Sequence, residues 1–203
     1  MAFIDYTYFT GDIHISNPSN DNQLLQAIDQ YEKEILIKLL GYELYALLQA
    51  DLTDGEPQTQ IYIDLVNGAA FTHEFGGEEI SLRWEGLRNS LKISLISYYV
   101  FFRFVERNIT PYYGDGISFA PKGKDWERAE PVNKLCYVWE KMRELYGVIP
   151  MQYKSAFKYP VLGSDLGYVF NTLPSAYNFL YANKDDYPTW RFTPLWNINA
   201  FGI

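Results

Sequence analysis

The chain has 203 residues, of which 48% are hydrophobic and 21% are charged, and its formal net charge is −8. This length and apolar content suffice for one domain with a proper core, and they exclude a chain that is disordered throughout. The acidic balance argues against a protein that grips nucleic-acid phosphates, because that binding depends on clustered Lys and Arg.

The single cysteine, Cys136, lies in an apolar stretch, so the chain cannot form an internal disulfide. We interpret it as a buried structural thiol and expect a reducing, intracellular folding environment. The first residues lack the basic and continuous apolar regions of a secretory signal, so we expect no export by that route. The most apolar segment, 91–105, contains Lys and Arg and falls short of the roughly 20 apolar residues of a membrane span. We therefore expect it to be a core helix.

Residues 1–19 combine Tyr and Phe with the turn formers Gly, Asp, Asn and Pro. This composition predicts an extended N-terminal arm rather than a helix. The side chains of Tyr6, Tyr8 and Phe9 need an apolar partner surface, and we predict that they contact a neighbouring subunit.

Residues 20–149 show the apolar spacing of a helical body. A first helix is expected to begin at a capping residue among 20–22 and to end at Gly41. A second, shorter helix carrying Leu44, Leu47 and Leu48 is expected to end in the acidic turn 51–57. A third helix is expected over 58–67 and is followed by a glycine.

Residues 69–83 alternate around Gly76-Gly77, which predicts a β-hairpin with a glycine turn. From about Arg83 to Arg107, including Leu91, apolar residues recur three or four positions apart, which predicts the longest helix of the chain. A loop rich in Pro and Gly then leads to a last helix, expected from Trp126 to Tyr146.

Residues 150–203 crowd aromatic side chains between five prolines, so they can form neither a long helix nor a core of their own. Their aromatic content is too high for a disordered segment, and permanent exposure would cause aggregation. We expect a long irregular arm that lies along the chain's own helical body and along neighbouring subunits. Its predicted subunit contacts are Tyr187, Trp190, Phe192, Trp196 and Phe201.

The expected fold class is therefore mainly α. It consists of a small helical bundle over 20–149 with one β-hairpin insertion near 69–83, an extended N-terminal arm over 1–19 and an irregular, aromatic-rich C-terminal arm over 150–203.

Residues that could carry chemistry are sparse. The two histidines, His14 and His73, have no Cys or second His at metal-ligand spacing. The His73-Glu74 pair is the best fragment for acid–base work, and the acidic turn 51–56 faintly resembles a calcium loop, but turn and surface roles explain both better. We expect no catalytic residue, no cofactor and no metal site.

Three segments, 28–45, 62–69 and 84–87, carry a recurring pattern. They contain a Leu-Gly-x-x-Leu-Tyr step at a helix end, a Leu-x-x-Gly helix end before the hairpin, and a Trp-x-Gly-Leu element at the opening of the long helix. In these motifs the chain resembles the head-to-tail connector, or neck adaptor, proteins of tailed bacteriophages, especially those that infect gut Bacteroidetes-type bacteria. The resemblance covers roughly residues 20–110.

The resemblance implies a mostly helical virion structural protein that forms a ring, commonly twelvefold, between portal and tail. Expected partners are other copies of the chain, the portal protein, and tail or other neck proteins. DNA would pass through the ring during genome ejection without specific binding, and no membrane is involved. The expected location is the virion neck or tail, and the host cytoplasm during assembly. The acidic balance agrees, because a wall that does not attract phosphates lets DNA slide.

Two alternatives come from other classes of function. Exposed aromatic side chains, among them some of the 18 tyrosines, could stack on sugars in a ligand-binding module, for example for glycans. An enzyme with a dispersed site is the weakest alternative. If the connector interpretation holds, we expect deletion of the C-terminal arm to abolish assembly while the helical body stays folded.

Overall fold

The computed structural model describes residues 2–16, 18, 21–75, 78–109, 112–113, 116–117, 131–147 and 174–195. The fold is mainly α, as predicted. Its α-helices are α1 (Asn22–Leu40), α2 (Tyr42–Asp51), α3 (Gln60–Asn67), α4 (Leu95–Ile109), α5 (Pro131–Tyr146) and α8 (Ala176–Ala182). Antiparallel pairs join β1 (Leu52–Thr53) to β2 (Glu56–Pro57), β3 (Ala69–Phe75) to β4 (Glu78–Trp84), and β5 (Tyr112–Tyr113) to β6 (Gly116–Ile117).

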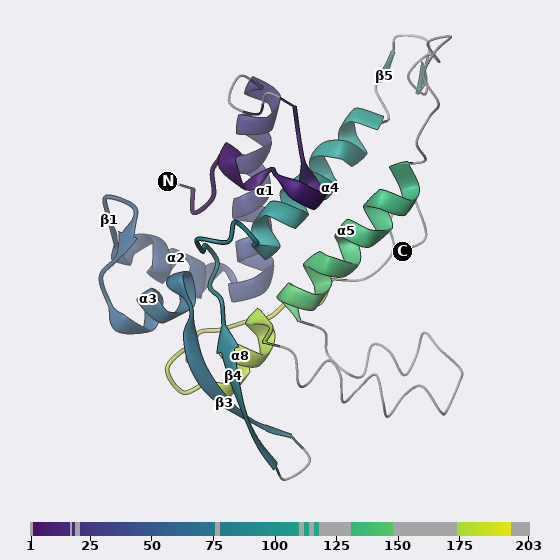
Figure 1. Ribbon diagram of the computed structural model, residues 1–203. Helices are drawn as coiled ribbons and strands as arrows, with labels where there is room; N and C mark the ends of the chain where they lie inside the picture. The colour runs from purple at the N-terminus through teal and green to yellow at the C-terminus, as the bar shows by residue number, and fades with distance from the viewer. Residues whose placement is uncertain are drawn as a thin grey trace.

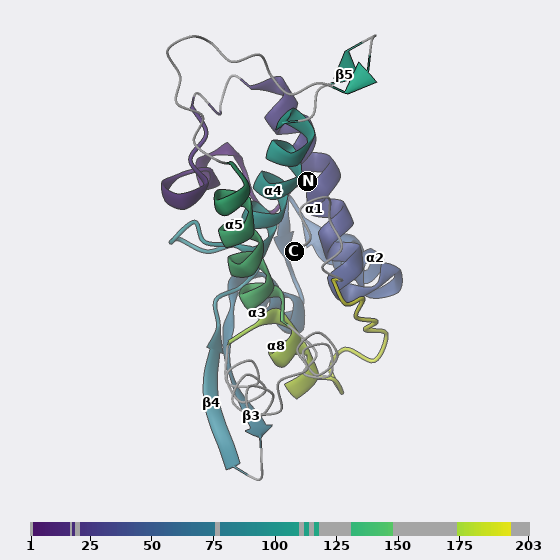
Figure 2. The same ribbon diagram turned by 90° about the vertical axis from the view of Figure 1, so that its right-hand side faces the viewer.

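Helices α1, α4 and α5 lie side by side, with α4 packed against both of the others (Figure 1). Each contributes an apolar face to one core, in which Phe102 of α4 meets Trp139 of α5 with ring centroids 4.7 Å apart. The β3–β4 hairpin extends away from the three helices at one end, beside α8, as the turned view also shows (Figure 2). The core therefore continues from the helices into the base of the hairpin.

The predicted boundaries of the first helix are confirmed. The Asp21 carboxylate accepts hydrogen bonds from the backbone N–H groups of Gln23 and Leu24, at 2.9 and 3.0 Å, and so caps α1. The helix ends where Gly41 adopts a φ of +80°, a conformation that favours glycine. These two local signals fix the length of the helix.

The acidic turn that follows α2 is a small β1–β2 hairpin. The Asp51 carboxylate accepts hydrogen bonds from the backbone N–H groups of Gln58 and Thr59, at 2.8 and 2.9 Å, just before α3 begins at Gln60. The carboxylate of Asp51 thus has a backbone-capping role. Of the three leucines that indicated α2, Leu44 and Leu48 are buried, whereas Leu47 is exposed.

The β-hairpin over 69–83 is confirmed, with its two turn glycines outside the described residues, but the predicted start of the long helix was wrong. Trp84 is the last residue of β4, and α4 begins only at Leu95, so the Trp-x-Gly-Leu element does not open the helix. Gly86 adopts a φ of +89° and turns the chain, and the Ser94 hydroxyl then accepts a hydrogen bond from the N–H of Ile96 to cap α4. As a result α1, with 19 residues, is longer than α4, with 15.

The last helix of the predicted body, α5, begins at Pro131, a residue suited to the first helical position. The earlier start predicted at Trp126 lies outside the described residues. Cys136 is half-buried on this helix rather than fully buried. Gly147, with a φ of +99°, ends α5 as predicted.

Residues 2–16 do not form the extended arm that the sequence predicted. They fold into two 3-10 turns, Tyr6–Tyr8 and Gly11–Ile13, and lie against the chain's own helices. Five of their apolar side chains belong to the core: Phe3, Ile4, Tyr8, Phe9 and Ile13. Most of the aromatic side chains that suggested an external partner are therefore buried against the chain itself.

A buried carboxylate of α1 holds this segment in place. The Glu32 side chain is buried, and it accepts hydrogen bonds from the backbone N–H groups of Phe3 at 2.7 Å and Ile4 at 3.2 Å. Burial raises the pKa of Glu32 to about 7, although the two N–H bonds partly oppose this rise. The spacing of Ile28, Glu32 and Leu36 puts this carboxylate on the apolar face of α1.

This raised pKa predicts an unusual pH dependence of stability. The folded state binds the Glu32 proton more tightly than the unfolded state, so the contribution is largest below the unfolded pKa of 4.5 and is lost as the pH rises through about 7. Between pH 5.5 and pH 8.5, the wild-type chain should lose on the order of 2 kcal/mol of unfolding free energy relative to Glu32→Gln. Urea unfolding of both chains at the two pH values measures this difference. Parallel pH profiles would contradict the assignment.

The described part of the C-terminal segment, 174–195, also lies on the chain's own body. Helix α8 packs against β3 and the end of α5 (Figure 1), and Ala176, Phe179 and Leu180 are buried. The prediction that this segment lies along its own helical body is confirmed for these residues. Among the described helices, none combines the length and the apolar character needed to cross a membrane.

Candidate functional site

The predicted subunit-interface residues fall into four groups. Tyr6 is 40% exposed, whereas Tyr8, Phe9 and Tyr187 are buried within the chain. Trp190 and Phe192 are half-buried against the chain's own core. Trp196 and Phe201 lie outside the described residues. Among the described members of this set, Tyr6 alone is exposed in the single chain. The prediction of a subunit contact was wrong for the buried members, Tyr8, Phe9 and Tyr187, which are core residues.

Residues 190–193 form a strap across the C-terminal end of α1. The indole N–H of Trp190 donates to the carbonyl of Leu39 at 2.8 Å. The backbone N–H groups of Arg191 and Thr193 donate to the carbonyls of Leu40 at 3.0 Å and Lys38 at 2.8 Å. The last carbonyls of a helix have no partner within the helix, so the strap satisfies groups that would otherwise need water. Trp190 therefore has a structural role in its own chain.

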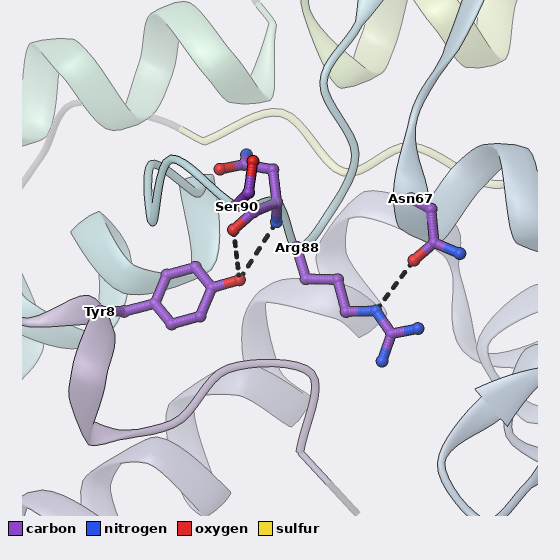
Figure 3. Close-up of a pocket in the computed structure, with 5 residues that line it drawn as sticks. Tyr8, Asn67, Arg88 and Ser90 are labelled. Carbon is purple, nitrogen blue, oxygen red and sulfur yellow. Dashed lines mark hydrogen bonds between the residues drawn. The ribbon is translucent and has the colours of Figure 1, made fainter.

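A separate concave site lies where the N-terminal segment, the end of α3 and the loop after β4 meet. Its volume is about 330 Å³, and Figure 3 shows four of its side chains labelled. The site is open to solvent. The lining residues are Tyr8, Asn67, Arg88, Asn89 and Ser90.

Two motif glycines bring these residues together. Gly68 and Gly86 cross so closely that a Cβ on Gly68 would lie 2.4 Å from the carbonyl oxygen of Trp84, and a Cβ on Gly86 would lie 2.5 Å from that of Val66. The crossing sets Asn67, immediately before Gly68, beside Arg88, two residues after Gly86. The sequence motifs indicated these glycines, but the site that the crossing creates could not be read from them.

Arg88 is fixed by three hydrogen bonds. Its backbone N–H donates to the carbonyl of Val66 at 3.1 Å, and its Nε donates to Oδ1 of Asn67 at 2.9 Å (Figure 3). Its Nη2 also pairs with the carboxylate of Glu56. The guanidinium is thus held in place on two of its nitrogen atoms, and its Nη1 makes no hydrogen bond to the described residues.

Tyr8 closes the other side of the site. Its hydroxyl donates to the carbonyl of Asn89 at 3.2 Å and accepts from the N–H of the same residue at 3.1 Å (Figure 3). The ammonium of Lys92 lies 4.6 Å from the centroid of its ring. Burial raises the pKa of Tyr8, so its hydroxyl stays protonated at neutral pH. Tyr8 therefore anchors the loop after β4 as a neutral group.

The segment 89–93 forms a tight turn beside the site. The Asn89 side chain donates to the carbonyl of Ile93 at 2.6 Å and accepts from its N–H at 3.2 Å. Lys92 adopts a φ of +59°, a strained conformation for a residue with a side chain. Leu91 is 67% exposed and Ile93 is 48% exposed. Leu91, expected on the apolar face of a helix, is instead the most exposed apolar residue of this turn.

The His73-Glu74 pair, the best fragment for acid–base chemistry in the sequence, lies on the β-hairpin, where His73 packs against other side chains. His73 is buried on β3, and its ring meets that of Tyr181 edge-on, with an angle of 74° between the ring planes. Burial lowers the pKa of His73, so its imidazole is uncharged at neutral pH. In the described ranges, no three His, Cys, Asp or Glu side chains are grouped so that they could hold a metal ion.

Chemically, the lining of the concave site offers hydrogen-bond donors. Its side chains include a guanidinium, two amides and two hydroxyls, and no carboxylate or imidazole. Such a lining suits the binding of an acceptor group rather than proton transfer. Comparisons with known proteins give no lead, because no family model, curated protein or solved structure matches the chain.

Proposed function

We propose that the chain is a virion structural protein, a head-to-tail connector or neck subunit of a tailed bacteriophage. It forms a ring, twelvefold by the resemblance, that joins portal to tail and lines the DNA channel. In this proposal the helices over 20–149 are the rigid bundle of each subunit. The ring resides in the virion neck, after assembly in the host cytoplasm.

The observation that carries the proposal is the surface formed by the 89–93 turn and the adjoining concave site. Leu91 and Ile93 are apolar and exposed. The turn that carries them is fixed by two hydrogen bonds, one from Nδ2 and one to Oδ1 of the Asn89 side chain. Rigid apolar side chains next to polar donors are typical of protein-binding surfaces, which combine an apolar centre with a polar rim. This favours an assembly partner over a small-molecule reaction.

The motif glycines add support. Gly41 lies at the joint between α1 and α2, and Gly68 and Gly86 form the crossing that positions Arg88. The three segments that resemble connector proteins therefore lie at joints that shape the subunit. The net charge of −8 is consistent with a channel wall that does not retain DNA.

The proposal is tested by mixing the purified full chain with the portal protein of the same phage. We expect the two to co-sediment, and negative-stain images of the complex to show a ring added to the portal. A chain that ignores the portal but binds glycans on an array would contradict the proposal and support the glycan-binding alternative.

A further inference from the structure

We propose that the concave site at Arg88, together with the 89–93 turn, receives an acidic side chain of a neighbouring copy of this chain. The inference rests on the proposed function, since it names one subunit contact of the ring.

Hydrogen-bond donors outnumber free acceptors in the site. Among the described residues, three donors of the lining have no hydrogen-bond partner: Nη1 of Arg88, Nδ2 of Asn67 and the hydroxyl of Ser90. Two acceptors of the lining are already used, because Asn67 Oδ1 accepts from Arg88 and the Asn89 carbonyl accepts from Tyr8. A ligand that only accepts hydrogen bonds fits this site, and an ionised carboxylate is such a group.

The charge of the site matches a single carboxylate. The guanidinium of Arg88 carries one positive charge, and the carboxylate of Glu56, its ion-pair partner, carries one negative charge. Lys92, whose ammonium lies over the Tyr8 ring, adds a second positive charge nearby. Arg88, Glu56 and Lys92 together carry one positive charge, and the carboxylates of Asp5 and Glu32, which also act on Tyr8, reduce this surplus further. A single carboxylate therefore suits the site better than a doubly charged phosphate.

The exposed apolar side chains of the turn favour a protein ligand over a free ion. Leu91 and Ile93 flank Lys92 and are exposed directly beside the donor site. A small anion would leave both side chains in water, whereas a protein surface that delivers a carboxylate would cover them as well. Burial of such apolar area next to a charged anchor is what a protein interface provides.

The composition of the chain points to a second copy as the partner. The chain has 25 acidic and 17 basic side chains, so carboxylates are the surplus charged group on every copy. A site that offers hydrogen-bond donors and positive charge is electrostatically complementary to the carboxylates on the surface of another copy. In a ring the contact is head-to-tail, so the site on one copy and the acidic group on the next belong to different surfaces.

The test uses sedimentation velocity of the full-length chain over a range of concentrations, with and without portal protein. Ser90→Asp places a negative charge at the site, and Ser90→Asn has nearly the same shape without the charge. Ser90 is exposed, so both variants should fold, which a thermal unfolding scan checks. We expect Ser90→Asp to weaken self-association by about tenfold or more and Ser90→Asn to change it by less than about threefold, because like charges at an interface repel.

A second pair of variants tests the apolar part of the surface. Leu91→Ser should weaken self-association about tenfold, whereas Leu47→Ser, at an exposed leucine on α2, should leave it within about twofold of wild type. Equal association of Ser90→Asp and Ser90→Asn, or of the two leucine variants, would overturn the inference while the ring proposal stands.

Other outcomes separate the two proposals. A wild-type chain that stays monomeric at every concentration and in the presence of portal protein would overturn both. If acetate or phosphate raises the unfolding temperature of wild type but not of Ser90→Asp, while self-association is the same in both, the site takes a free anion instead of a neighbouring subunit.

Discussion

Replacing Phe179 with alanine is expected to destabilise the chain by about 3–5 kcal/mol, the range for deleting a buried aromatic side chain. The Phe179 ring stacks on Trp84 with centroids 6.2 Å apart and meets Phe71 edge-on at 5.6 Å. It also contacts Tyr187 of the segment that follows α8. Removal of the ring leaves a cavity where the hairpin, α8 and the segment after α8 meet. Chemical denaturation of the purified variant measures the loss.

The matched control is Tyr181→Ala, on the same helix but with the Tyr181 ring 48% exposed. It should cost about 1 kcal/mol or less. Similar costs for the two variants would mean that α8 does not contribute to the core. The expected contrast also revises the sequence-based prediction that the helical body stays folded when the C-terminal arm is deleted. Without α8 and the strap, we expect the helical body itself to be strongly destabilised.

Replacing Gly68 with alanine is the second large expected effect, with a loss of at least about 3 kcal/mol. The new Cβ would lie 2.4 Å from the carbonyl oxygen of Trp84 and 2.8 Å from the carbonyl carbon of Glu85, and both of these atoms belong to backbone that cannot move aside cheaply. In addition, the φ of +90° is strained for any residue with a side chain. The crossing that shapes the Arg88 site should loosen.

Gly11→Ala separates strain from collision, because Gly11 also has a positive φ, +56°, but a Cβ added there would meet no other atom within 4 Å. It should cost about 1–2 kcal/mol from backbone strain alone. Thermal unfolding of the two variants gives the comparison. If Gly68→Ala is no worse than Gly11→Ala, the close crossing of Gly68 and Gly86 does not exist in solution.

Local signals in the sequence predicted much of the fold. Capping by a residue among 20–22, the glycine stops at Gly41 and Gly147, and the hairpin after Gly68 are all confirmed, because each depends on the conformation of a few consecutive residues. The start of α4 was missed because the apolar spacing runs on through 87–95. What ends the strand and delays the helix is the packing of Gly86 against residues 66–68, a contact that no local pattern reveals.

The candidate site was missed for the same reason. Asn67 and Arg88 are 21 residues apart, and Tyr8 and Asn89 are 81 apart, so only the folded chain brings them together. Glu32 did leave a signal, a carboxylate on an apolar helix face, but the residues that bind it are in the N-terminal segment. The aromatic residues at both ends of the chain suggested external partners. The sequence shows how much apolar surface must be buried, but it does not show whether the chain itself or a partner buries it.

Hydrogen–deuterium exchange of the full chain, alone and assembled with portal, tests directly which surface meets the neighbouring subunit. The amides of Arg191 and Thr193, which donate to α1, should be protected in both states. The amides of Ser90 and Leu91 should exchange rapidly in the free chain and slow markedly in the assembly. Protection of residues 190–193 only in the assembly, with no change at residues 90–91, would contradict a subunit contact at the Arg88 surface. It would mean that the strap contacts the neighbouring subunit instead.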